Sequence, residues 1–148
     1  MKDFDFNTWW KGLPVIAKAA FIALAIYIVL TIHSALKEFK FTLGKQSTLA
    51  GYMSQGQQPS FPDSVYRNLA DDLERAMRGA GTNEQLIFTT IGKLKNDVDA
   101  IKLNKAFGMR SSWGISYSLR EWLEGDLSSK DLQKVWQIMD FNGITYRF

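Results

Sequence analysis

Residues 13–36 read LPVIAKAAFIALAIYIVLTIHSAL and contain no Asp, Glu or Arg. As an α-helix, this stretch of 24 residues would extend ~36 Å, whereas the hydrocarbon core of a bilayer is ~30 Å thick. Lys18 and His33 lie near its two ends, from which their polar groups can reach the lipid headgroups. The other side chains are apolar on every side of the helix, and such a helix must be buried. The stretch therefore predicts a single transmembrane helix.

Two other interpretations of residues 13–36 are a buried core helix and a cleaved secretory signal. A chain of 148 residues offers little protein to surround a core helix of this length. A secretory signal has a shorter apolar region followed by small residues, whereas this stretch continues as KEFKF. Both comparisons favour an uncleaved membrane anchor.

The segments on either side of the apolar stretch are typical of a membrane–water interface. Residues 1–12 form a polar and aromatic head that ends next to the predicted helix, and Pro14 suits the first helical turn. Aromatic rings and cations at such a boundary contact lipid headgroups. The predicted membrane-interface residues are Trp9, Trp10, Lys11, Lys18, His33, Lys37 and Lys40.

The net charge of +3 is concentrated near the apolar stretch. Residues 1–62 contain six Lys and three acidic residues, whereas residues 63–148 contain equal numbers of basic and acidic side chains. The excess positive charge can therefore interact with anionic lipid headgroups. Residues 63–148 have no excess positive charge with which to attract nucleic acid. Cysteine is absent, which excludes disulfides and thiolate metal sites.

Residues 37–62 are rich in Gly, Ser and Gln and lack a long apolar run. This composition predicts a flexible spacer, stiffened at its end by Pro59 and Pro62. The aromatic side chains within it, Phe39, Phe41 and Tyr52, are interpreted either as part of an interfacial shoulder or as contacts to a partner or to the bilayer surface.

Residues 63–148 predict a helical domain, because apolar residues recur at helical spacing between clear breaks. The first helix is expected to begin at Asp63 or Ser64 and to end before residues 78–81. The second is expected to begin at Thr82, in a capping box with Gln85, and to end at Gly92.

Three further helices are expected after Gly92. The third begins at Asn96 and ends at Gly108, and residues 109–114 form a loop. The fourth contains Ile115, Leu119, Trp122 and Leu123, and the fifth is capped by Ser128 with Asp131 and ends near Gly143. The resulting fold class is all-α: a transmembrane helix, a spacer and a compact five-helix bundle, with the apolar residues 144–148 packed back on it. The three tryptophans of this part are expected in its core: Trp113, Trp122 and Trp136.

Two motifs of the predicted bundle resemble an annexin repeat. Residues 77–84 read MRGAGTNE, similar to the Gly-x-Gly-Thr-acid loop that follows the first annexin helix. Residues 123–128 read LEGDLS, similar to the annexin segment between the fourth and fifth helices. The resemblance covers residues 65–139 and implies a single annexin-like repeat of the kind found in small proteins of bacteria and phages, fused to an N-terminal transmembrane helix.

The resemblance also implies a calcium site. In annexins the loop binds calcium through backbone carbonyls and the later acid supplies a carboxylate. The corresponding carbonyls here are those of Met77, Gly79 and Gly81, and the carboxylate is that of Asp126. Calcium takes six to eight oxygen ligands, and glycines let carbonyls converge. The alternative is that Gly79 and Gly81 simply permit a tight turn between helices.

Catalytic chemistry is poorly represented in the sequence. The only histidine is His33, within the apolar stretch, so residues 63–148 cannot form a His-dependent acid–base site. There is no P-loop motif and no zinc-ligand set. Carboxylate pairs such as Asp97 with Asp99 or Glu121 with Glu124 are expected on solvated faces or helix caps rather than in a hydrolase site.

These observations favour a non-enzymatic, single-pass membrane protein. We expect the helical domain to hold a larger assembly at a bilayer. The assembly consists of copies of this chain or of other proteins. Examples are a bacterial envelope complex and the shell of a phage virion that has an internal membrane. One alternative is a calcium-dependent module that binds anionic lipid and bridges membranes. A second is a phage lysis or pore-associated protein.

Overall fold

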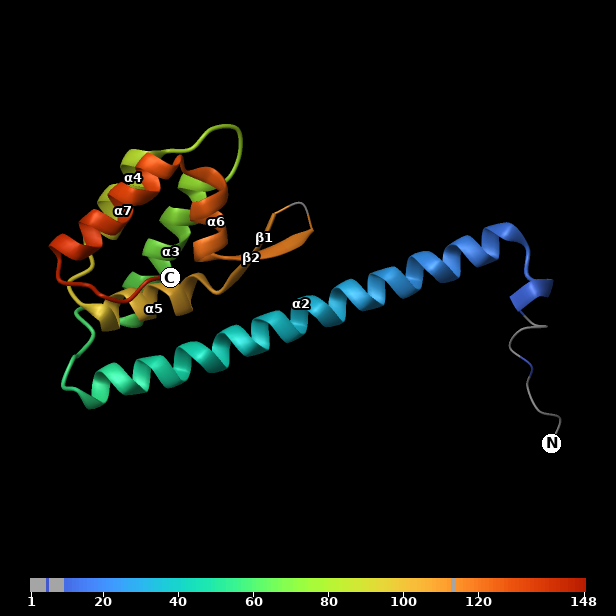
Figure 1. Ribbon diagram of the computed structural model, residues 1–148, viewed down its shortest axis with the longest axis horizontal. Helices are drawn as coiled ribbons and strands as arrows, with labels where there is room; N and C mark the ends of the chain where they lie inside the picture. Colours follow the sequence, from blue (N-terminus) through green and yellow to red (C-terminus); the bar gives the residue numbers. More distant parts are fainter. Residues whose placement is uncertain (1–4, 6–9, 113) are drawn as a thin grey trace. The chain divides into compact units, whose positions relative to one another are not determined.

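The computed structural model describes residues 5, 10–112 and 114–148. The described chain is mostly helical, which confirms the all-α class. It divides into two compact units, Met1–Lys37 and Glu38–Phe148. Figure 1 shows the succession of helices, with one long helix near the N-terminus.

Helix α2 (Val15–Ser54) contains almost all of the stretch predicted to cross a membrane. It is the only helix among the described residues that is long and apolar enough to do so, and none of its apolar window is buried. Its large apolar side chains are exposed, for example Tyr27 at 68% and Val29 at 63%. The described residues therefore do not form a protein core around it, although an N-terminal signal sequence would meet the same criteria of length and composition.

The prediction of a flexible spacer over residues 37–62 is wrong for most of that range, because α2 continues to Ser54. The physical reason is that residues on one face of this helix are partly buried, a pattern that the Gly, Ser and Gln content hides. The half-buried positions recur with spacings of three and four residues, as one face of a helix requires: Phe41, Lys45, Thr48, Leu49 and Tyr52.

This part of α2 belongs to the second unit and contacts its C-terminal tail. Lys45 donates a hydrogen bond through Nζ to the hydroxyl of Tyr146, and its ammonium lies over the rings of Phe41 and Tyr146. Asn104 donates to the same hydroxyl at 2.8 Å. Burial lowers the pKa of Lys45 and raises the pKa of Tyr146 to about 12.

Five helices follow in the order expected from the sequence: α3 (Asp63–Met77), α4 (Glu84–Ile91), α5 (Asp97–Phe107), α6 (Leu119–Asp126) and α7 (Ser129–Phe141). Helix α3 packs against both α4 and α5, and α4 packs against α7. The caps of α5 and α7 are as predicted, because Asn96 and Ser128 accept hydrogen bonds from the amides of Asp99 and Asp131. The closer assignment to an annexin-like bundle remains a prediction.

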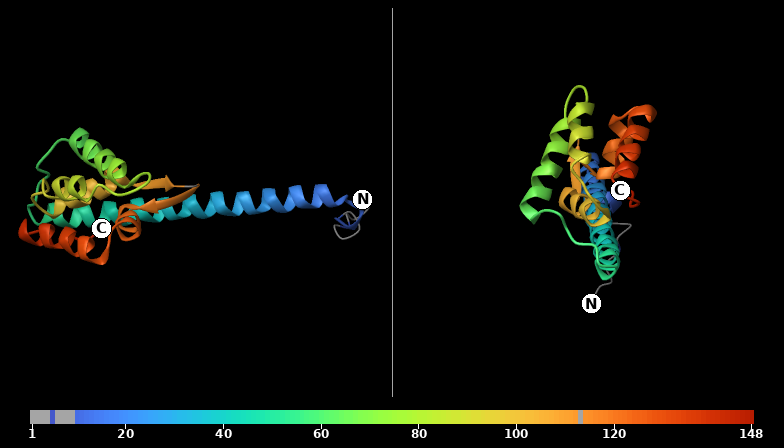
Figure 2. Two further views of the ribbon diagram at one scale, coloured as in Figure 1. Left: turned by 90° about the horizontal axis from the view of Figure 1, so that it is seen from above. Right: turned by 90° about the vertical axis from the view of Figure 1, so that its left-hand side faces the viewer.

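Residues 109–118 form a β-hairpin rather than a loop and the start of a helix. Strand β1 (Met109–Ser112) pairs antiparallel with β2 (Ile115–Ser118), with Ser112 opposite Ile115. Gly114, directly before β2, has a positive φ of 80°, which is typical of hairpin turns. Ile115 lies in β2 and is 57% exposed, so its predicted place in the fourth helix is wrong. Figure 2 shows the hairpin extending from the helices of its unit.

The predicted caps of α3, α4 and α6 also need correction. Pro62 is the N-cap of α3 and Asp63 lies in its first turn. The capping box of Thr82 with Gln85 is wrong, because Asn83 caps α4 by accepting from the amide of Leu86 at 3.0 Å. Helix α6 begins with a capping box that the sequence analysis missed, formed by Ser118 and Glu121.

One apolar core joins the five helices and the C-terminal tail. Its fully buried residues include Leu73, Ile87, Leu103 and Leu123. Ile144 and Phe148 are 1% and 6% exposed, which confirms that the tail packs back on the domain. Trp122 is buried and Trp136 packs against the core as predicted, whereas Trp113 lies outside the described residues.

Two buried carboxylates at the start of α5 hold segments that are distant in sequence. Asp97 accepts hydrogen bonds from the amides of Thr145 and Tyr146 at 2.7 and 2.6 Å. Asp99 accepts from the amide of Ser60 at 2.8 Å and from the hydroxyl of Tyr66 at 2.5 Å. Because helix N-termini favour negative charge, these carboxylates fix both the connection before α3 and the tail without needing a Lys or Arg partner.

Candidate functional site

A cleft of the second unit, with a volume of about 800 Å³, lies at the junction of α3, the β-hairpin and α6. Its lining includes Met77, Ala80, Tyr117 and Trp122, of which Met77 and Trp122 are buried. Its polar surface includes Arg78, Glu121 and Asp126. We refer to it as the α3–α6 cleft. It combines an aromatic wall with charges of both signs, which is typical of a surface that binds a peptide segment or a small polar ligand.

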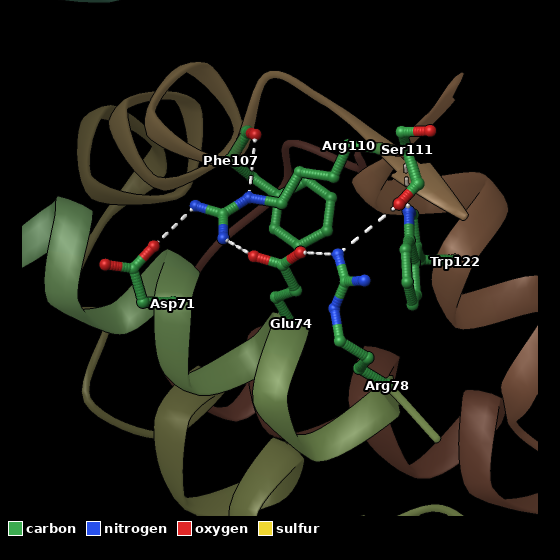
Figure 3. Close-up of polar contacts among 7 residues, drawn as sticks. All are labelled: Asp71, Glu74, Arg78, Phe107, Arg110, Ser111 and Trp122. Atoms are coloured by element: carbon green, nitrogen blue, oxygen red, sulfur yellow. Dashed lines mark hydrogen bonds and ion pairs between the residues drawn. The ribbon is translucent and has the colours of Figure 1, made fainter. Parts of the chain in front are cut away.

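A network of two arginines around one glutamate supports the wall of this cleft (Figure 3). Glu74 of α3 accepts hydrogen bonds from Arg78, one turn later, and from Arg110 of β1. Arg110 also pairs with Asp71 at 2.7 Å. The side chains of Glu74 and Arg110 are 21% and 16% exposed, so this ion pair is largely shielded from solvent. The hairpin is thus fixed to α3 by charge-assisted hydrogen bonds.

The same arginines pack on the aromatic rings beside the cleft. The guanidinium of Arg110 lies 4.8 Å from the centre of the Phe107 ring and donates to the Phe107 carbonyl at 3.1 Å. The guanidinium of Arg78 lies 5.9 Å from the Trp122 ring. Trp122 in turn donates through Nε1 to the Arg110 carbonyl at 3.3 Å. These contacts link α3, the hairpin and α6 into one wall.

Opposing effects determine the pKa of Glu74. Burial by itself would raise this pKa, but the hydrogen bonds and positive charges of Arg78 and Arg110 outweigh burial and lower it. Glu74 is therefore ionised at neutral pH. Asp126 differs, because burial raises its pKa.

We expect Glu74→Gln to destabilise the domain by about 1–3 kcal/mol, because Arg110 would keep its charge in a shielded position without its main partner. The loss should be largest at neutral pH. Because folding lowers the pKa of Glu74, the stability it contributes is present above the ordinary value of 4.5 and disappears as the pH falls through the lowered value. Denaturant unfolding of the full chain in detergent, followed by near-ultraviolet circular dichroism, measures this difference.

The matched control is Glu124→Gln, which removes the exposed pair with Arg120 on α6. Exposed ion pairs contribute ~0–1 kcal/mol, so this variant should unfold close to the wild type at every pH. Equal losses in the two variants would contradict a special role for Glu74.

The loop predicted to bind calcium does border the cleft. Gly79 and Gly81 have φ angles of 112° and 91°, a conformation that strongly favours glycine. Thr82 donates through Oγ1 to the Asp126 carbonyl at 3.3 Å, so the loop is joined to the end of α6. Met77, Gly79 and Asp126 line the same cleft, and Gly81 follows directly in the loop.

Other features of the cleft differ from a calcium site. Arg78 places a positive charge among the lining residues. Among the described residues no cluster of three or more His, Cys, Asp or Glu side chains is suited to a metal ion. The calcium assignment for Met77, Gly79, Gly81 and Asp126 therefore stays a prediction.

The predicted membrane-interface residues lie along the N-terminal part of the described chain. Trp10 packs edge-on against Phe21 with ring centres 6.2 Å apart, and Lys18 donates to the Lys11 carbonyl at 3.2 Å. His33 and Lys40 are exposed and Lys37 is half-buried. Trp9 lies outside the described residues.

Arg78 and Tyr117, which line the cleft, and Arg110, which supports it, were not predicted from the sequence. Arg78 directly precedes the glycine loop, and its spacing of four residues from Glu74 indicates a pair on one helix face. No comparable local signal identifies Arg110 or Tyr117, because their positions depend on the hairpin.

Comparison of the chain with protein-family models, with curated proteins and with solved structures gives no match.

Proposed function

We propose that the chain is a single-pass membrane protein whose helical domain is a non-enzymatic docking module. In this role it holds a larger assembly, such as an envelope complex or a virion shell, to a bilayer. The observation that carries the proposal is that no residue in the apolar window of α2 is buried, in a helix that leads into a folded domain. Exposed apolar surface on this scale is unfavourable in water and favourable in lipid.

The α3–α6 cleft supports the docking part of the proposal. Two of its charged side chains have structural partners: Arg78 pairs with Glu74, and Glu121 accepts from the Ser118 amide in the capping box at 2.7 Å. An aromatic wall beside charged groups that are held by structural contacts is suited to binding a partner. The order of the five helices and the contact of Thr82 with Asp126 also support an annexin-like arrangement of this domain.

Membrane fractionation of the full chain tests the proposal. We expect the protein to sediment with membranes, to resist alkaline carbonate extraction and to keep its full mass of 16.9 kDa. A shortened, soluble product would instead show that the apolar stretch is a signal sequence. A full-length product in the supernatant would show that α2 is covered by protein.

The calcium-dependent binding of anionic lipid is a second candidate function, favoured by the position of the glycine loop beside Asp126. It predicts that the full chain, reconstituted in phosphatidylcholine nanodiscs, captures phosphatidylserine vesicles only when calcium is present. Asp126→Asn should abolish this capture, because it removes the only carboxylate assigned to the ion. Glu124→Gln is the control for a nearby change of charge. Capture that is unaffected by calcium would exclude this candidate.

A further inference from the structure

A second, smaller pocket of about 270 Å³ lies where the first turns of α3 and the last turns of α5 meet Leu49 of α2. We call it the α3–α5 pocket. Its cations are Arg67, Lys102 and Lys105, and its one carboxylate is Asp63. The lining therefore has two excess positive charges, although residues 63–148 are neutral as a whole. Folding concentrates charge here that the sequence distributes over two helices.

The cations of the pocket differ in how they are held. Lys102 is 20% exposed, lies 5.6 Å from the centre of the Tyr66 ring and donates to Asp63. Lys105 donates to the Gln46 side chain at 2.9 Å, which directs its ammonium toward α2. The side chain of Arg67 is exposed and forms no hydrogen bond or ion pair within the described part of the chain.

Asp63 lines this pocket together with the three cations and competes for them with any bound anion. Its carboxylate is 72% exposed and contacts Lys102 from one side. The hydrogen bond from Lys102 and its charge, together with the charges of Arg67 and Lys105, lower the pKa of Asp63. One carboxylate cannot neutralise three cations. A bound anion would therefore be attracted electrostatically by all three.

The remaining surface of the pocket is apolar. Leu49 and Ala106 form part of its lining, together with Tyr66, which is buried. A cationic rim with an apolar base suits an anion that carries an apolar or neutral group, as a phosphate ester does. Arg is well suited to phosphate because its planar guanidinium can donate two parallel hydrogen bonds.

We propose that the α3–α5 pocket binds a phosphate group, held by Arg67, Lys102 and Lys105, either in a small soluble phosphate ester or in the headgroup of an anionic lipid. The soluble case does not depend on the proposed membrane function. The lipid case rests on it, because the headgroup must come from the bilayer that holds the chain.

The test measures thermal unfolding of the full chain against probe concentration at constant ionic strength, since a ligand of the folded state raises the midpoint. The soluble probes are inorganic phosphate and glycerol 3-phosphate, with chloride as the reference. The lipid probe is phosphatidic acid mixed into phosphatidylcholine nanodiscs that contain the chain. The soluble arm is also valid in detergent or plain buffer, so a failure to insert into lipid would not affect it.

The double variant Arg67→Gln with Lys105→Gln should weaken the apparent affinity for the effective probe by about tenfold or more, because two charge-assisted contacts are lost. The control, Arg75→Gln with Lys130→Gln, removes the same charge from exposed positions outside the pocket and should stay within about twofold. The variant Asp63→Asn should bind the effective probe about threefold more tightly, because it removes the carboxylate that competes with the probe for the cations. A gain in affinity cannot result from misfolding.

Stabilisation by inorganic phosphate or by glycerol 3-phosphate identifies a soluble ligand, and stabilisation by phosphatidic acid alone identifies a lipid headgroup; either supports the proposal. Three results would overturn it: no shift with any probe, equal losses in the two double variants, or weaker binding by Asp63→Asn in a protein with wild-type circular dichroism.

Discussion

Replacing Ile26 and Val29 together with lysine is expected to abolish membrane integration. Both positions lie within the apolar stretch of α2 and are 55% and 63% exposed. A lysine near the centre of a transmembrane helix costs ~2.5–3.5 kcal/mol on insertion scales, so the pair would cost ~5–7 kcal/mol. Neither lysine has a partner in the bilayer, and neither lies near an end from which it can reach the headgroups. The carbonate-resistant fraction of the full chain measures the effect.

The control adds the same two charges to the same helix outside the apolar stretch. Leu43 and Ser47 are exposed positions of α2 in the second unit, one helical turn apart. Leu43→Lys with Ser47→Lys should leave the carbonate-resistant fraction unchanged. If the Ile26 and Val29 variant also remained integral to the membrane, residues 13–36 would not cross the hydrocarbon core.

Replacing Asp99 with alanine is expected to destabilise the folded domain by about 3–5 kcal/mol. Asp99 is 0% exposed and accepts hydrogen bonds from Tyr66, from the Ser60 amide and from the Lys95 amide at 2.9 Å. Alanine would leave these three donors without an acceptor in a region of low solvent access. It would also remove a negative charge from the first turn of α5. Denaturant unfolding of the full chain in detergent measures the loss.

Asp131→Ala is the matched control because Asp131 also lies at the third position of its helix, α7, but near the surface. Its carboxylate accepts from the hydroxyl of Ser128 at 2.5 Å, and its loss should cost ~0.5–1 kcal/mol. A similar cost for both variants would show that the buried carboxylate of Asp99 does not hold the connection before α3.

Local signals explain which parts of the fold were predictable. The helix over residues 13–36, the caps at Asn96 and Ser128 and the helix ends beside glycine are set by neighbouring residues. The apolar character of residues 144–148 likewise predicted their burial, since large apolar side chains are unfavourable in water. These features depend on spacing and side-chain type, which a sequence states directly.

The incorrect predictions arise where contacts with distant segments, rather than neighbouring residues, determine the structure. Residues 37–54 have the composition of a spacer but are helical, because a stripe from Phe41 to Tyr52 gains burial against the domain. Residues 109–118 were assigned to a loop and a helix, but they pair as a hairpin whose Arg110 is held by Glu74 of α3. In both places a contact with a distant segment outweighs local propensity.

The sequence alone determined that the chain is all-α, with an apolar helix long enough to cross a bilayer and a neutral helical domain. Both properties follow from composition and period, which do not depend on what the chain packs against. Only the tertiary structure revealed the α3–α6 cleft and the α3–α5 pocket, because each brings together side chains from elements that are distant in sequence. The domain is neutral as a whole, so its net charge gives no sign of Arg67, Lys102 and Lys105. Their positive charges are concentrated in one place only when α3 packs against α5.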